Sequence, residues 1–95
     1  MTLLDALTAD PQTKRELASK VGLSTREVEL LINSYRRDGV WIVSNSQGYR
    51  YAASIEEMQD CARRLRERAI HQLITARAMR RAARDFKTVE MVLGL

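Results

Sequence analysis

The chain has 95 residues, which is enough for one small domain with an additional helix. Hydrophobic residues make up 45% of it and charged residues 29%, a balance typical of a folded globular protein rather than of a disordered one. No apolar run approaches the length needed to cross a bilayer, so we expect no membrane partner. With a single cysteine, Cys61, and a single histidine, His71, the sequence predicts no intramolecular disulfide, no metal site and no cofactor.

The net charge of +4 is concentrated in the second half of the chain. Residues 1–53 hold seven Lys/Arg and six Asp/Glu, whereas residues 54–95 hold nine and six. A basic segment of this kind favours a polyanionic partner. The first ten residues, MTLLDALTAD, contain two acids and no base, which is not typical of a secretory signal. We therefore expect the protein in the reducing cytoplasm.

Helix starts are marked by a Ser or Thr followed three residues later by Glu, the capping box that satisfies the first free N–H groups of a helix. The pairs are Thr13 with Glu16, Ser24 with Glu27, and Ser54 with Glu57. Apolar spacing predicts helices over about residues 2–7, 14–21, 25–37 and 55–86. In the second and third helices the positions expected to face the core are Leu17, Ala18, Val21, Val28, Leu31, Ile32 and Tyr35.

From Val40 the period of the pattern changes to that of β-structure. The segment VWIV is β-branched and aromatic, SNSQG has turn composition, and YRYAA alternates. We predict a hairpin over about 40–45 and 49–53, with inward side chains at Val40, Ile42, Tyr49 and Tyr51. The predicted fold class is thus mainly α with a small β-hairpin: a winged helix-turn-helix over residues 1–53, followed by a long basic C-terminal helix over 54–95.

Residues 1–53 resemble a known family of DNA-binding domains. The matching residues are Glu16-Leu17-Ala18, Gly22-Leu23-Ser24, Val28, Ile32, Tyr35, Gly39-Val40 and Gly48-Tyr49. On these residues the segment resembles the N-terminal winged helix-turn-helix domain of biotin ligase/repressor proteins and of related bacterial and phage regulators. The resemblance does not extend beyond residue 53.

The resemblance implies that the third helix lies in the major groove of DNA. The base contacts would then be Thr25, Arg26, Glu29 and Asn33, where the fork of Arg26 suits guanine and the amide of Asn33 suits adenine. The contacts to the DNA backbone would be Lys14, Arg15, Ser24, Arg36, Arg37 and Arg50. Two features depart from a simple DNA-binding surface: Glu29 and Leu30 take groove-facing positions, and the wing tip Ser44–Gly48 has no Lys or Arg.

The long helix carries a heptad-like stripe that predicts self-association. The seam residues are Met58, Ala62, Leu65, Ala69, Ala76, Met79, Ala83 and Phe86, with Gln72 at the remaining position. Ile70, Leu73 and Ile74 widen the stripe at its middle, which favours either an assembly with more than two helices, such as four, or folding of this helix back onto residues 1–53. Eight arginines cover the rest of the surface between residues 63 and 84, and their partner could be a phosphate backbone, an RNA or an acidic protein.

Taken together, these patterns predict a non-enzymatic protein that binds double-stranded DNA as an oligomer, such as a small phage-like transcriptional regulator. No nucleophile–base set or phosphate-binding loop is visible, so we expect no enzymatic activity. One alternative is a DNA-packaging or replication accessory protein whose helical tail assembles a ring or recruits a partner. The other is a winged-helix protein-interaction module that does not bind DNA.

Overall fold

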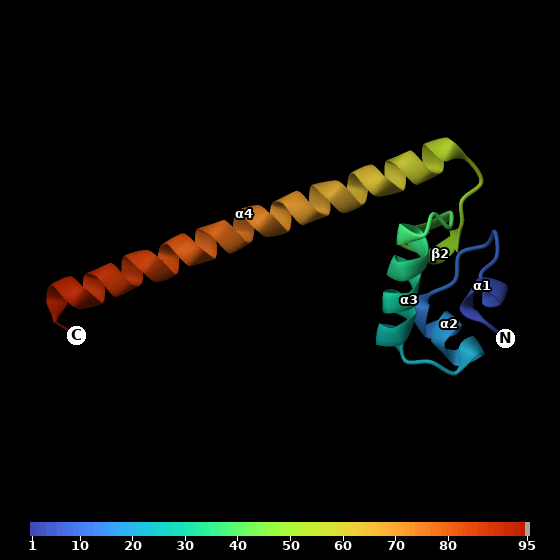
Figure 1. Ribbon diagram of the computed structural model, residues 1–95, viewed down its shortest axis with the longest axis horizontal. Helices are drawn as coiled ribbons and strands as arrows, with labels where there is room; N and C mark the ends of the chain where they lie inside the picture. Colours follow the sequence, from blue (N-terminus) through green and yellow to red (C-terminus); the bar gives the residue numbers. More distant parts are fainter. Residues whose placement is uncertain (95) are drawn as a thin grey trace. The chain divides into compact units, whose positions relative to one another are not determined.

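The computed structural model describes residues 1–94, apart from the side chains of residues 88, 89 and 92. Helices α1 (Leu3–Ala6), α2 (Lys14–Val21) and α3 (Thr25–Arg37) are followed by strands β1 (Ile42–Asn45) and β2 (Gly48–Tyr51) and by helix α4 (Ile55–Leu93) (Figure 1). This order confirms the predicted fold class: mainly α, with a small hairpin and a long C-terminal helix. Leu95, the last residue of the predicted second domain, lies outside the described residues.

The chain divides into two compact units, Met1–Ala62 and Arg63–Leu95. The first unit therefore contains the first two turns of α4 as well as residues 1–53. Cys61, in the second of these turns, is a buried free thiol. No helix of the described residues combines the length and the apolar character that crossing a membrane requires.

The starts of α2 and α3 confirm the predicted capping boxes at Thr13 and Ser24. Gly22 ends α2 in the left-handed conformation with a φ of 70°, which glycine adopts without steric cost. Helix α1 begins with a box that the sequence reading missed, because the partner of Thr2 is Asp5 instead of Glu. This helix is also shorter than predicted, since Leu7 is already extended.

One aliphatic core holds the first unit together. Its buried members come from all three short helices, the end of α1 and the first strand: Leu3, Ala6, Leu7, Leu17, Ala18, Val28, Ile32 and Ile42. Val21, Leu31 and Tyr35 pack around it half-buried, so all seven core-facing positions predicted for α2 and α3 are confirmed. Burying an aliphatic side chain contributes about 1.5–3 kcal/mol, so this core is the main source of stability for the unit.

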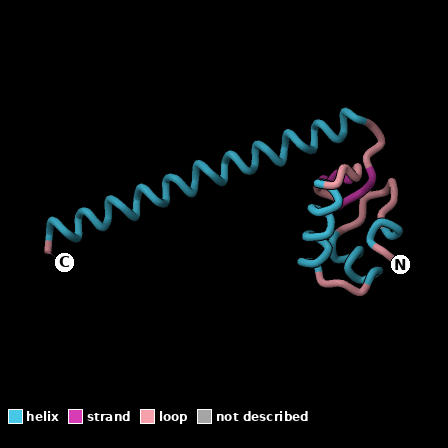
Figure 2. The backbone as a smooth tube through the Cα atoms, viewed as in Figure 1, coloured by secondary structure: helices cyan, strands magenta, loops and turns pink. Residues whose placement is uncertain are grey.

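The hairpin is shorter than predicted, over 42–45 and 48–51, with Ile42 opposite Tyr51 and Asn45 opposite Gly48. Its strands are drawn in magenta in Figure 2. Ile42 is buried as predicted, but Val43, on the other side of the strand, is buried as well. Val40, Tyr49 and Tyr51 pack half-buried against the core, so the four predicted inward positions are confirmed, while the burial of Val43 shows that the other face of β1 is covered as well.

An isolated β-bridge ties a third segment of the chain to the two-stranded hairpin. Gln12 pairs with Tyr49 through two backbone hydrogen bonds, of 2.9 Å from the Gln12 N–H and 2.8 Å from the Tyr49 N–H. The Gln12 side chain is buried, and its Nε2 donates to the Ala6 carbonyl at 2.8 Å. The link between α1 and α2 thus fixes the hairpin to the helices, which a two-stranded ribbon needs because it is barely stable alone.

Candidate nucleic-acid interface

Helix α3 is held by its inner side. Val28 and Ile32 are fully buried in the core. At its start the Ser24 hydroxyl accepts the Glu27 N–H, and the Glu27 carboxylate accepts the Ser24 N–H. Both contacts fix the first turn of the helix, which is the part that a groove-binding helix presents to base edges. The predicted backbone contact Ser24 is exposed, and its hydroxyl oxygen serves as this cap.

The outer side of α3 is exposed over its whole length. Arg26, Leu30, Asn33 and Arg37 recur at the spacing that puts residues on one side of a helix, and all four are exposed. The Arg26 side chain is 75% exposed, and Leu30, between the polar residues, is 52% exposed. Thr25 is exposed as well, about 100° around the helix from Arg26. The structure therefore brings two of the predicted base-contacting residues, Arg26 and Asn33, together with Arg37.

Glu29 lies between two of the predicted DNA-binding cations. Its carboxylate accepts a hydrogen bond from Lys14 Nζ in the first turn of α2, and it lies 3.6 Å from the Arg26 guanidinium. The hydrogen bond from Lys14 lowers the pKa of Glu29 below its ordinary value, and Arg26 adds a smaller effect in the same direction. The same hydrogen bond raises the pKa of Lys14. At neutral pH this cluster is thus two cations around one anion, on the exposed surface where α2 and α3 meet.

Arg15 follows Lys14 in the first turn of α2 and is exposed. The N-terminus of a helix carries partial positive charge, so cations placed there form an electropositive end suited to phosphate. One acid, Glu16, is also in this turn and closes the capping box with Thr13. Lys14 and Arg15 are thus both exposed in the first turn of α2, with Lys14 bound to Glu29, and their contact with DNA stays a prediction.

Arg36 is used within the fold. Its Nε donates to the Ile42 carbonyl at 3.0 Å and its Nη2 donates to the Ser44 hydroxyl at 3.1 Å. The guanidinium also lies 5.7 Å from the centre of the Tyr49 ring, a cation–π distance. These contacts hold the end of α3 against the hairpin. Arg36 thus lies away from the outer face that Arg26 and Asn33 share.

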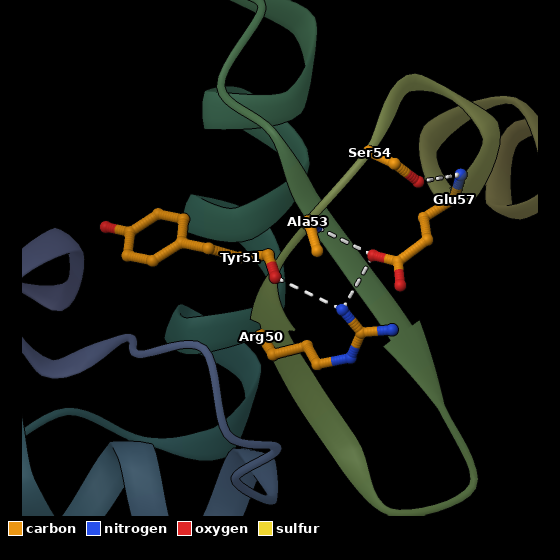
Figure 3. A network of polar contacts seen from close by, with 5 residues as sticks. All are labelled: Arg50, Tyr51, Ala53, Ser54 and Glu57. Carbon is orange, nitrogen blue, oxygen red and sulfur yellow. Dashed lines mark hydrogen bonds and ion pairs between the residues drawn. The ribbon is translucent and has the colours of Figure 1, made fainter.

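Arg50 is another predicted backbone contact that has partners inside the chain (Figure 3). Its Nη1 donates to the Glu57 carboxylate at 2.8 Å and to the Tyr51 carbonyl at 3.2 Å. Glu57 also accepts the Ala53 N–H at 2.7 Å, while its own N–H donates to the Ser54 hydroxyl at 3.2 Å. The predicted box at Ser54 is therefore modified, since the glutamate reaches the N–H one residue before the expected one.

This network shifts the pKa of both charged partners. The hydrogen bond from Arg50, followed by that from the Ala53 N–H, lowers the pKa of Glu57. The hydrogen bond to Glu57 raises the pKa of Arg50. The pair joins β2 to the first turn of α4 within the first unit. Arg50 is thus a link in the fold rather than a side chain extended from the wing.

The predicted seam on α4 is exposed almost throughout. Met58, in the first unit, is half-buried, whereas the seam residues from Ala62 to Phe86 are all exposed. Met79 and Phe86 have 68% and 64% of their surface exposed, and Ile70, Leu73 and Ile74 are exposed at the middle. Self-association through these residues remains a prediction, with an exposed apolar stripe, interrupted at Gln72, available for it.

One exposed aromatic residue belongs neither to the predicted core nor to the predicted interface. Trp41 precedes β1 and is 46% exposed. Its exposure was predictable, because Trp41 stands between the inward positions Val40 and Ile42.

Among the described residues no group of three or more metal-ligating side chains lies together.

Comparison of this chain with protein families, with curated proteins and with solved structures found no match in any of the three.

Proposed function

We propose that this chain is a non-enzymatic double-stranded DNA-binding protein that acts as an oligomer, such as a small phage-like transcriptional regulator in the cytoplasm. The observation that carries the proposal is the outer face of α3, where exposed Arg26, Asn33 and Arg37 lie in line on a helix held by the core. From Arg26 to Asn33 the helix rises about 10 Å, close to the length of three base pairs. A guanine-reading fork and an adenine-reading amide at this separation suit a short half-site.

Phosphate contacts would come from the first turn of α2, where Lys14 and Arg15 are exposed beside the start of α3. Such contacts set the orientation of a recognition helix but carry no base preference. Arg37 is placed to add one more at the far end of α3. Arg36 and Arg50 are not part of this proposal, because their guanidinium groups bind the hairpin and Glu57.

The role proposed for Glu29 is to select among sequences. A phosphate near Lys14 meets the negative charge of Glu29, so binding to arbitrary DNA is weakened. Where a cytosine amino group is in reach, the same carboxylate accepts its hydrogen bond, and the repulsion is offset. Glu29 thus favours a matching site over other DNA instead of adding general affinity.

The small net charge of residues 1–53 is the reason why the proposal includes oligomerisation. Residues 1–53 carry a balance of only seven basic against six acidic residues, and phosphate neutralisation supplies much of the affinity for DNA. Joining two or more such units multiplies the number of contacts. The exposed apolar stripe of α4 is the surface that we propose for this association.

The experiment that tests the proposal is selection of duplexes from a random library, followed by titration of the selected site. Arg26→Ala should cost about 1–3 kcal/mol on that site and relax preference at one base position. Arg15→Ala is the matched comparison, since it should weaken binding to all sequences alike and lower the salt slope by about 1. If no sequence is enriched and Arg26→Ala leaves binding unchanged, α3 does not read bases.

A second function, docking to another protein, is favoured by one observation. Leu30 is exposed in the centre of the outer face of α3, with Glu29 beside it, an arrangement that suits a protein partner as well as a base edge. A docking module would show no salt-dependent affinity for any DNA sequence. The same titrations therefore separate the two functions.

A further inference from the structure

The last three turns of α4 before residue 88 separate basic and apolar side chains onto different sides of the helix. Five cations recur at spacings of three and four residues: Arg77, Arg80, Arg81, Arg84 and Lys87. At about 100° per residue they occupy roughly a third of the circumference. The apolar residues Ala76, Met79, Ala83 and Phe86 lie along another side.

The basic side, which we call the Arg77–Lys87 face, is exposed at every one of its five cations. Arg80, Arg84 and Lys87 line an open hollow together with Ala83, at the boundary between the basic and the apolar side. Asp85 is the one acidic residue between positions 77 and 87. Like charges three and four residues apart repel one another on a helix, so this concentration of cations favours an anion held across them.

We propose that the Arg77–Lys87 face binds the phosphate backbone of duplex DNA, as a second contact surface separate from the base-reading face of α3. The proposal rests on the proposed function for its choice of DNA as the partner. Arginine forks match phosphate oxygens in bidentate geometry, and the face extends over about 15 Å, which reaches several phosphates along one strand. It would contribute affinity without base preference.

The composition of the face favours a duplex over single-stranded nucleic acid. Binding of single strands depends on aromatic side chains on which bases stack. The aromatic residue of this segment, Phe86, lies with Met79 and Ala83 on the apolar side, not among the cations. The apolar side is also the one that we propose for self-association, so a second copy of the chain would leave the basic side exposed.

The test uses the full chain and a labelled duplex of arbitrary sequence, titrated by fluorescence anisotropy at several salt concentrations. Arg80→Ala/Arg84→Ala removes two cations from the face. Its matched control is Arg64→Ala/Arg68→Ala, which removes the same charge from sides of the same helix that the Arg77–Lys87 face does not occupy. Alanine is a strong helix former, so circular dichroism should show an unchanged helix content for both variants.

We expect Arg80→Ala/Arg84→Ala to reduce the slope of log affinity against log salt by roughly 1.8, because each lost phosphate contact accounts for about 0.9. The control should change it by less than half as much. Equal slopes for the two variants would overturn the proposal, as would tighter binding of a single-stranded RNA of the same length or equal competition by poly-L-glutamate. Arg26→Ala, measured in parallel on a selected site, reports on α3 alone. If base reading by α3 fails, the change of salt slope in Arg80→Ala/Arg84→Ala still tests the Arg77–Lys87 face.

Discussion

At Gly48 the hairpin lies very close to the link between α1 and α2. Its φ of 132° lies in the region that favours glycine, and a Cβ at this position would stand 2.2 Å from the Gln12 carbonyl oxygen and 2.8 Å from the Thr13 nitrogen. The neighbouring Tyr49 makes both backbone hydrogen bonds to Gln12. The pairing of Gln12 with β2 therefore depends on the absence of a side chain at residue 48.

Gly48→Ala should thus destabilise the first unit through both strain and overlap. Gly39→Ala is the control, because Gly39 has a φ of 90° but no atom within 4 Å of an added Cβ. Backbone strain alone should cost the control about 1 kcal/mol, and overpacking should add about 1–3 kcal/mol for Gly48→Ala. Urea unfolding followed by circular dichroism measures the difference. Equal midpoints for the two variants would contradict the close approach of Gln12.

Glu29 offers a second test at the scale of one side chain. Glu29→Gln keeps the size of the residue but removes the negative charge between Lys14 and Arg26. We expect the affinity for duplexes of arbitrary sequence to rise several-fold, since both cations become available to phosphate. The affinity for a selected site should rise less, so the ratio of the two falls. A ratio unchanged from the original chain in parallel anisotropy titrations would remove Glu29 from selection.

How far the sequence predicts single residues depends on how far apart the interacting partners lie. Capping at Thr13 and Ser24 was predictable because both halves of each box lie within four residues. The bridge from Gln12 to Tyr49 spans 37 residues, and no local pattern marks it. The roles of Arg36 and Arg50 were not predictable either, because a basic residue near a proposed interface looks the same whether its charge meets phosphate or the chain itself.

At the scale of the elements, the junction between β2 and α4 is held by a network of hydrogen bonds around Glu57. Glu57 accepts from Arg50 and from the Ala53 N–H, and these hydrogen bonds lower its pKa from the ordinary 4.5. A carboxylate with a lowered pKa in the folded state contributes stability above its unfolded pKa. That contribution is lost as the pH falls through the lowered pKa of Glu57, because the protonated carboxyl group has no negative charge for Arg50 to stabilise.

Glu57→Gln should therefore be less stable than the original chain at pH 7. The difference in unfolding free energy between the two should shrink as the pH falls below 4.5 and vanish below the lowered pKa of Glu57. Urea titrations over a pH series measure it. A difference that stays constant from pH 7 to acid would show that the ionised carboxylate is not what joins β2 to α4. Glu56→Gln, one residue earlier and exposed, is the matched control.

The boundaries of the elements follow the same rule of distance. The predicted bounds of α2 and α3 agree with the structure residue for residue, since caps, apolar spacing and Gly22 all act locally. The hairpin was predicted too long because its ends depend on pairing. Its register places Ile42 opposite Tyr51, and the backbone of Trp41 instead accepts the Ala52 N–H outside the ladder. The exposure of the outer face of α3 was predictable from the apolar spacing. The hydrogen bond from Lys14 to Glu29 was not, because its two partners lie on different helices.

At the scale of the whole chain, the question is what stabilises α4 over residues 63–87. Every one of them is exposed, including large apolar side chains such as Leu65, Leu73 and Phe86. Helices in water gain most of their stability by packing an apolar side, and an isolated helix is marginal even with favourable residues. Within one copy, residues 63–87 have no such packing. The stripe from Ala62 to Phe86 therefore predicts that helix formation and self-association are linked.

Leu65→Glu tests this link and its consequence for DNA binding. If the original chain associates as we propose, a charge in the stripe should lower its solution mass toward the 10.9 kDa of one copy. Helix content should fall together with the mass. Ala78→Glu introduces the same charge on another side of the helix and is the control.

The consequence for DNA binding is measured on duplexes with one and with two half-sites. Joined units bind the second half-site as an intramolecular step, so the affinity of Leu65→Glu for the double site should fall at least tenfold. Its affinity for one half-site should change little. Light scattering and anisotropy titration measure the two effects. A lower mass with undiminished affinity for the double site would mean that each unit reads DNA independently of α4.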